Sequence, residues 1–189
     1  MYYGALEAGG TKMVCAIGDA DKNIIDRISI PTGTPDQSVP AMIDYFKKYD
    51  ISALGIGTFG PADVNPNSPT YGSIMRSPKK AWEGFSLYKA FTDALGCLVV
   101  VDTDVNAAAW GEYLYGALKG LNSGMYLTVG TGIGGGIISD GRLIHGMEHP
   151  ETGHILIPRR IGDDIPCTCR FHQSCVEGLA AGPMLERRT

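Results

Sequence analysis

The sequence has no run of about 18 or more consecutive apolar residues, so a helix that spans a membrane is not expected. It also has no long basic run, and its 16 Lys and Arg against 20 Asp and Glu leave a net charge of −4. Nucleic acid is therefore not expected as a partner. The first residues, Met1–Glu7, lack the basic start and the apolar core of an export signal. Low-complexity segments are absent as well, and these absences together favour a cytoplasmic protein that binds neither membranes nor nucleic acid.

The composition is that of a globular chain. Its 189 residues, 44% hydrophobic and 19% charged, suit one large domain or two small ones and fit neither disorder nor a coiled coil. Glycine, with 26 residues, has about twice its usual share, which indicates loops whose backbone closely approaches another group. Of the five cysteines, three lie between Cys167 and Cys175, and all four histidines lie between His145 and His172. This cluster favours metal binding over disulfides.

Short apolar runs alternate with segments of helical spacing, which predicts an α/β fold. Three strands are followed by helix, strand, helix, strand and helix, the order of a ribonuclease H-like half-domain. We expect Pro40 to lie in the first turn of the first helix, where proline is tolerated. The expected elements are strands 3–7, 13–17 and 24–30, helix 38–49, strand 54–59, a helix after Ser86 that stops at Gly96, strand 98–101 and a helix from Asp104 to about Ala117.

The pattern then restarts, with strands expected at 125–129 and 135–139 around a glycine-rich turn, and a short helix at 176–188. We therefore expect two domains: a complete N-terminal lobe over residues 1–117, and the beginning of a C-terminal lobe over residues 118–189. The half-built second sheet is expected to expose an apolar face and unpaired strand edges. Connections in compact domains are mostly short, so the long loops 62–85 and 145–175 are expected to carry function or metal.

A glycine-containing loop, Glu7–Lys12, follows the first expected strand. Gly9 and Gly10 let the backbone turn sharply and offer N–H groups to an anion, Lys12 adds a positive charge, and Thr11 adds a hydroxyl donor. The alternative is a simple Gly-Gly hairpin with an exposed lysine. The spacing of the glycines and the lysine is not that of a P-loop.

A second loop has the same relation to the second set of strands. Five of the seven residues in 130–136 are glycine, more than a hairpin turn needs, and close approach to a phosphate chain explains the excess. A purely structural turn is the alternative here too. Two equivalent loops, one in each half, favour a nucleotide whose phosphates are gripped from both sides.

Asp104 follows a buried strand and begins a helix, at the end of the sheet where α/β folds bind ligands. As a general base it would accept the proton of an attacking hydroxyl. The alternative is that Asp104 only caps the helix.

The histidine and cysteine cluster has the composition of a zinc site. Cys169, His172 and Cys175 supply three ligands, a closed tetrahedral site needs four, and either His154 or Cys167 supplies the fourth. Two carboxylates, Glu151 and Glu177, flank the cluster and suit a polyhydroxylated ligand, although most glutamates are solvated surface residues. The other two histidines, His145 and His149, have no evident partner and are taken as loop residues.

Together, these residues resemble the ROK family of repressors and sugar kinases, and within it the bacterial fructokinases. The resemblance covers residues 3–188. It lies in five motifs that occur in the family's order: Glu7–Lys12, Thr103–Ala108, Gly130–Gly136, Glu151–His154 and the run from Cys169 to Glu177.

The resemblance implies a two-lobed fold of the actin-hexokinase type, here with an incomplete second lobe, and ATP-dependent phosphorylation of a hexose, foremost D-fructose to fructose 6-phosphate. It makes Asp104 the catalytic base and implies Mg²⁺, structural Zn²⁺, a small-molecule sugar substrate and a homodimer. The other implied sites are the sugar contacts Gly60, Thr103, Glu151, His154 and Glu177, the phosphate contacts Gly9, Gly10, Thr11, Lys12, Thr131, Gly132 and Gly134, and the zinc ligands His154, Cys169, His172 and Cys175.

Three departures favour the fructokinase branch: Thr103 replaces the usual Asn of the glucokinases, Glu7 replaces the commoner Asp, and the metal motif contains His172. Family kinases are also longer and contribute an adenine-binding segment that has no counterpart here. The alternatives are therefore a non-catalytic fragment that binds sugar and zinc, and a kinase for mannose, glucose or an N-acetylhexosamine. A sugar-responsive regulator is not expected, because no DNA-binding segment precedes the first strand.

Overall fold

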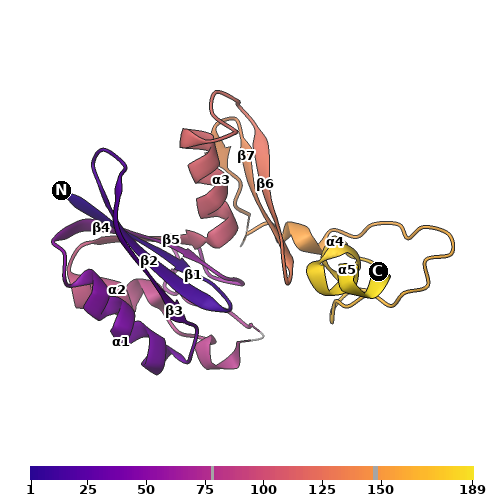
Figure 1. Ribbon diagram of the computed structural model, residues 1–189, viewed down its shortest axis with the longest axis horizontal. Helices are drawn as coiled ribbons and strands as arrows, with labels where there is room; N and C mark the ends of the chain where they lie inside the picture. Colours follow the sequence, from indigo (N-terminus) through magenta and orange to yellow (C-terminus); the bar gives the residue numbers. More distant parts are fainter. Residues whose placement is uncertain (78, 147–148) are drawn as a thin grey trace. The chain divides into compact units, whose positions relative to one another are not determined.

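A computed structural model describes residues 1–77, 79–146 and 149–189 (Figure 1). The chain forms two compact units: unit 1 comprises Met1–Ala107 together with His149, and unit 2 comprises residues 108–146 and 150–189. The division falls inside a helix rather than after residue 117, and the assignment of two lobes stays a prediction. Within the described ranges, no helix is both long and apolar enough to cross a membrane.

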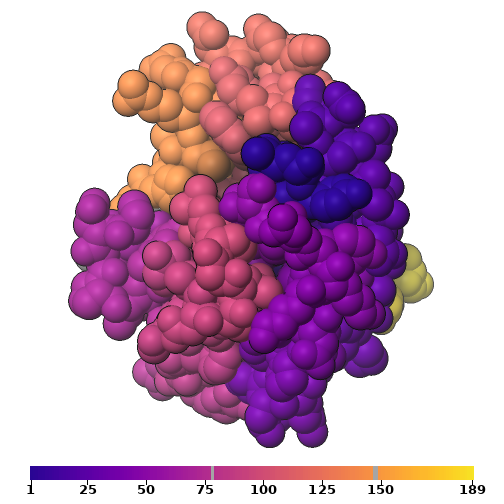
Figure 2. Space-filling model, turned by 90° about the vertical axis from the view of Figure 1, so that its left-hand side faces the viewer, coloured from indigo at the N-terminus to yellow at the C-terminus, as the bar shows by residue number. Residues whose placement is uncertain are grey.

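Unit 1 is built on a five-stranded sheet in which a meander of antiparallel strands joins parallel strands at β1. Its α/β character and its strand order confirm the expected ribonuclease H-like half. In spatial order the strands are β3 (Ile24–Pro31), β2 (Lys12–Asp19), β1 (Tyr2–Ala8), β4 (Ile51–Thr58) and β5 (Leu98–Thr103). The N-terminal residues, indigo in Figure 2, lie at the surface, and Met1 is exposed.

Two helices, α1 (Pro35–Phe46) and α2 (Leu87–Leu95), lie side by side along this sheet (Figure 1). Their buried side chains, among them Phe46 and Phe91, join the strand side chains in one core. Helix α1 begins earlier than expected, because Pro35 occupies its first turn and the Thr34 N–H donates to Gln37 Oε1 at 3.1 Å. The expectation for Pro40 was wrong: it lies inside the helix, beyond the first turn.

The long segment 62–85 is part of the core of unit 1 rather than a peripheral loop. Ala62, Ile74 and Trp82 in this segment are all fully or almost fully buried. The segment ends in a short 3₁₀ helix, η1 (Lys80–Trp82), and the Trp82 indole N–H donates to the Gly33 carbonyl at 2.9 Å. The burial of these apolar side chains stabilises the position of the segment against the sheet.

Tyr71, in the same segment, covers an edge of the sheet. Its hydroxyl accepts a hydrogen bond from the Val101 N–H (2.7 Å) and donates one to the Val101 carbonyl (2.9 Å). Val101 lies on β5, the outermost strand of the sheet order. The hydroxyl therefore satisfies two backbone groups that an edge strand leaves open.

Unit 2 contains a three-stranded antiparallel sheet of β6 (Gly124–Val129), β7 (Ile133–Ser139) and β8 (Arg142–Leu143), in that order. Alternate residues of β6, namely Met125, Leu127 and Val129, are about half exposed. The expected exposure of an apolar face is therefore confirmed. Helix α3 (Asp104–Tyr115) links the two units in sequence and ends just before the expected Ala117.

The C-terminal segment contains two short helices, α4 (Val176–Ala180) and α5 (Gly182–Arg188), so the expected single helix was wrong. The chain is extended at Ala181, with φ −68° and ψ 163°. Pro183 explains the break, because its ring lacks an N–H and would clash with the carbonyl four residues earlier in a continuous helix. A further 3₁₀ turn, η2 (Thr152–His154), precedes this segment.

Replacing Tyr71 with Phe tests the covered edge. The variant leaves the N–H and carbonyl of Val101 without their partner, so unfolding should become easier by roughly 1–3 kcal/mol. Tyr71→Phe and the control Tyr88→Phe would be compared by denaturant unfolding. The Tyr88 ring lies tilted against the Tyr71 ring, with centroids 4.9 Å apart, and its hydroxyl has no hydrogen bond within the described residues. Equal stability of the two variants would contradict a role for the Tyr71 hydroxyl.

Candidate functional site

Two loops and a helix follow the parallel strands of unit 1 at the same end of the sheet. Strands β1, β4 and β5 are parallel, and their register pairs Ala8 with Thr58 and Thr58 with Thr103. The loops that start at residues 9 and 59, and the helix α3, therefore begin next to one another, at the carboxyl ends of the strands. Of the predicted residues, Gly9 and Gly60 lie in the two loops and Asp104 is the first residue of the helix.

Gly57 allows the close approach between β4 and the start of α3. A Cβ at this position would lie 3.0 Å from the Ala107 Cβ and 3.2 Å from the Asp104 Cα. Gly60, which follows on the same loop, is half-buried and is joined to Pro61 by a cis peptide bond. The Pro61 carbonyl accepts the Met75 N–H at 2.8 Å, which ties this loop to the 62–85 segment.

The capping of helix α3 falls to Thr103 rather than to Asp104. The Thr103 Oγ1 accepts the Asn106 N–H at 3.2 Å, the bond that an N-cap residue makes, and Thr103 is buried. Asp104 Oδ1 accepts the N–H of its neighbour Val105 at 2.9 Å, which is not the bond to the third helical residue that a cap makes. Its carboxylate is therefore not explained as the cap of the helix.

Asp104 is half-buried, and burial is the main cause that raises the pKa of its carboxyl above the ordinary value. The Val105 N–H opposes this shift, and the nearby negative charge of Glu7 adds to it. A carboxylate with a raised pKa is a stronger base than an ordinary one. Proton acceptance from a hydroxyl is chemistry that this group suits.

His149 lies outside helices and strands, as expected of a loop residue, but the expectation that it has no partner was wrong. Its Nε2 accepts the Ala62 N–H at 3.3 Å, and its charge lowers the pKa of Asp104, against the effect of burial. His149 thus belongs to unit 1 next to the candidate base. No signal in the sequence links it to residues more than forty positions away.

The first glycine loop is a tight hairpin between β1 and β2. The Gly9 N–H donates to the Lys12 carbonyl (3.0 Å), and a Cβ at Gly9 would lie 2.6 Å from that oxygen, so only glycine fits. Thr32 closes the hairpin, because its N–H donates to the Thr11 carbonyl and its hydroxyl to the Gly9 carbonyl. Gly10, Thr11 and Lys12 are exposed, as a loop that receives an anion requires.

The second glycine loop, in unit 2, is held by the C-terminal segment. The Gly130 carbonyl accepts the Gly182 N–H at 2.7 Å, and Glu177 Oε2 accepts the Ile133 N–H at 3.0 Å. A Cβ at Gly132 would lie 2.6 Å from the same Glu177 oxygen. Glu177, predicted as a sugar contact, therefore has one carboxylate oxygen on this loop. Thr131, Gly132 and Gly134 lie where the sequence predicted, in the turn and the start of β7.

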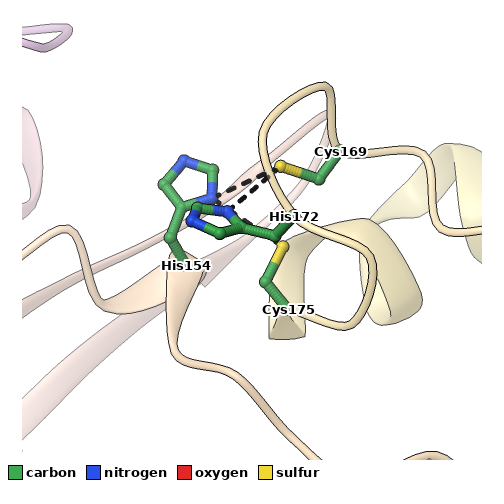
Figure 3. Close-up of side chains that lie close together, drawn as sticks. All are labelled: His154, Cys169, His172 and Cys175. Atoms are coloured by element: carbon green, nitrogen blue, oxygen red, sulfur yellow. Dashed lines mark hydrogen bonds between the residues drawn. The ribbon is translucent and has the colours of Figure 1, made fainter.

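Four predicted metal ligands come together in unit 2 (Figure 3): one ligand atom from each of His154, Cys169, His172 and Cys175 lies within 4.8 Å of the others. His154 comes from η2, Cys175 immediately precedes α4, and the other two lie on the loop between. The His154 Nδ1 is 3.8 Å from both sulfur atoms, and the His172 Nδ1 is 3.5 Å from the Cys169 sulfur.

The donor set fits a tetrahedral zinc ion. Zinc bond lengths to sulfur and nitrogen place neighbouring ligand atoms roughly 3.5 to 3.8 Å apart, which matches the observed separations. With Nδ1 turned to the cluster, the His154 Nε2 lies 4.0 Å from Glu151 Oε2, which is longer than the hydrogen bond by which a carboxylate orients a ligating histidine. The alternative ligand Cys167 is outside the group of four, and its sulfur packs against Gly178 instead.

Burial is the first cause that raises the pKa of the Cys175 thiol, to about 11, and the neighbouring Cys169 adds to the shift. The Cys175 thiol would therefore be protonated at neutral pH unless a cation replaces the proton. The cluster thus has the chemistry of a metal site rather than of a reactive thiol.

The sequence matches the family model "ROK family" over residues 3–189. It is 48% identical to a putative fructokinase of Bacillus subtilis (strain 168) over 98% of this chain and 62% of the relative, and 44% identical to a fructokinase of Pediococcus pentosaceus over 100% of this chain and 66% of the relative. The fold matches a ROK family glucokinase from Streptomyces griseus, solved with glucose and AMPPNP, with TM-score 0.79 and 31% identity over 99% of this chain and 59% of that one. The chain thus spans just under two thirds of the length of these curated relatives.

Replacing Gly153 with Ala tests how the metal cluster is held. An added Cβ would overlap with the Ile133 carbonyl on β7, so the turn that carries His154 must shift. We expect a lower melting temperature and weaker metal binding, measured by thermal unfolding and by metal titration. Gly146→Ala is the matched control, since no atom of the described residues lies within 4 Å of its added Cβ. A Gly153→Ala protein that binds metal like Gly146→Ala would contradict the constraint.

Proposed function

The chain belongs to the ROK family, and on this premise we propose that it carries the catalytic machinery of a hexose kinase that transfers phosphate from ATP to D-fructose, giving fructose 6-phosphate. The preference for fructose rests on the similarity to relatives named fructokinase at 44% and 48% identity. The observation that supports the chemistry is Asp104, a half-buried carboxylate at the carboxyl ends of the parallel strands. Thr103, not Asp104, caps helix α3.

In this proposal Asp104 accepts the proton of the sugar hydroxyl as that oxygen attacks the terminal phosphorus of ATP. Phosphoryl transfer needs positioning and charge stabilisation more than covalent chemistry. The backbone N–H groups of the two glycine loops and the charge of Lys12 would hold the phosphates. Mg²⁺ would supply neutralisation of the phosphate charge when bound. The sugar contacts proposed are Gly60, Thr103, Glu151, His154 and Glu177.

The cluster of His154, Cys169, His172 and Cys175 is proposed to hold a structural Zn²⁺. Four protein ligands close a tetrahedral site and leave no open position for catalysis. The ion would link η2 to the loop before α4. Since Glu177 lies two residues after the ligand Cys175 and holds the second glycine loop, the ion would also stabilise that loop.

The structural match to the Streptomyces griseus glucokinase supports glucose as an alternative substrate. A polypeptide that binds sugar and zinc without catalysing transfer stays an alternative prediction. Sugar-dependent ADP release with fructose, mannose, glucose and N-acetylglucosamine decides among them: turnover highest with fructose supports the proposal, and sugar binding without turnover supports the non-catalytic function. A homodimer stays a prediction.

Replacing Asp104 with Asn removes the proton acceptor at nearly constant size. We expect kcat to fall roughly 10²- to 10⁴-fold, the usual contribution of a general base, with sugar affinity retained. Asp93→Asn is the control, because Asp93 only forms an exposed ion pair with Lys89. Coupled measurement of ADP release and calorimetric titration of the sugar separate the two effects.

The pH profile of kcat provides the second readout for Asp104. A general base must be deprotonated, and the pKa of Asp104 is raised, so activity should fall as the pH falls through that raised value. The Asp104→Asn protein should lack this acid limb. Near-normal turnover of Asp104→Asn, or an unchanged acid limb, would refute the assignment of the base.

Metal analysis tests the zinc site. Protein prepared without chelators should contain about one equivalent of zinc, and Cys169→Ser should lose most of it together with thermal stability. Cys167→Ser is the matched control, because Cys167 lies in the same loop but outside the ligand group. Loss of metal from Cys167→Ser with retention in Cys169→Ser would show that the ligands have been assigned wrongly.

A further inference from the structure

The Lys79 side chain lies against the first glycine loop, although Lys79 is 67 positions after Lys12, the last residue of that loop. A Cβ added at Gly10 would lie 3.3 Å from the Lys79 Cε, so the lysine stem is in contact with the exposed tip of the loop. Its Nζ lies 6.0 Å from the centroid of the Phe59 ring, on the neighbouring loop at the same edge of the sheet. Lys79 is half-buried.

The backbone around Lys79 is anchored to the residues that close the glycine loop. The Lys79 N–H donates to the buried Ser77 hydroxyl at 3.2 Å, and the Lys79 carbonyl accepts the Trp82 N–H at 2.9 Å. The Trp82 indole in turn donates to Gly33, which follows the Thr32 that binds the loop. The position of Lys79 relative to the loop is therefore set by rigid contacts.

No carboxylate neutralises this lysine within the described part of the chain, where no ion pair involves Lys79. The adjacent Lys80 behaves in the opposite way: its Nζ binds Glu83 at 2.9 Å, and its side chain is 71% exposed. Cation–π attraction to Phe59 holds the Lys79 ammonium over a ring without cancelling its charge. An anion at the loop would supply the missing partner.

We propose that Lys79 is a phosphate-binding residue that contacts the transferred phosphoryl group at the Gly9–Lys12 loop, opposite the loop's own N–H groups. The identity of this ligand rests on the proposed kinase function. The class of ligand, a phosphate monoester or inorganic phosphate, rests on the lysine and the exposed glycine hairpin themselves. In the reaction, Lys79 would bind charge on the phosphoryl oxygens before and after transfer, while Asp104 accepts the proton.

Calorimetric titration of the 189-residue protein with fructose, fructose 6-phosphate and inorganic phosphate tests the proposal. Lys79→Met keeps the stem over Phe59 and removes the charge. It should weaken fructose 6-phosphate and phosphate binding roughly tenfold or more, as expected for loss of a charge-assisted contact, and leave fructose affinity unchanged. Lys79→Arg should restore most of the affinity, and Lys80→Met should behave like the unaltered protein.

Equal weakening of fructose and fructose 6-phosphate would show that Lys79 is structural and would overturn the proposal, as would an unchanged affinity for fructose 6-phosphate in Lys79→Met. If the unaltered protein binds neither sugar, the proposed kinase function fails, and the titration with inorganic phosphate then decides for Lys79 alone. Phosphate binding that depends on Lys79 and not on Lys80 would sustain the anion site. Phosphate binding that is absent, or independent of Lys79, would refute it.

Discussion

The parallel register of β1, β4 and β5 is the constraint on which the candidate active site of unit 1 depends. It places Ala8, Thr58 and Thr103 in one row, so that two loops and helix α3 start from the same end of the sheet. Gly57, which has no side chain, leaves the space in which the start of α3 packs on β4. Thr103, the last residue of β5, accepts the Asn106 N–H and so caps the helix that begins with Asp104.

Local patterns in the sequence were enough for most of the elements and for three residues of the metal cluster. Alternating and helical spacing located the five strands of the first sheet and two of the three strands of the second, where β8 was missed. The compact spacing of Cys169, His172 and Cys175 limited the fourth ligand to two candidates. Tertiary structure decided between them, since His154 reaches the cluster while Cys167 packs against Gly178. Ligands within one short loop are predictable because the chain has little freedom to separate them.

Contacts between distant segments were not predictable in this way. His149 meets Ala62, and Lys79 meets Gly10, through the fold alone, and neither pair shares a sequence pattern. The break at Ala181 was missed for a different reason: the apolar spacing of 176–188 is helical, and a single proline outweighs it. The early start of α1 was missed although Thr34 and Gln37 have the spacing of a capping box and Pro35 follows Thr34 directly, two signals of a helix start.

The β6 strand carries a consequence for the behaviour of the chain in solution. Met125, Leu127 and Val129 form an exposed apolar row on a strand that ends the sheet order of unit 2. An exposed apolar row beside the unpaired N–H and C=O groups of an edge strand can pair with strands of other molecules, whatever their sequence. Self-association of the 189-residue chain should therefore depend on protein concentration. It should increase in concentrated samples, and it should not depend on sugar, nucleotide or metal.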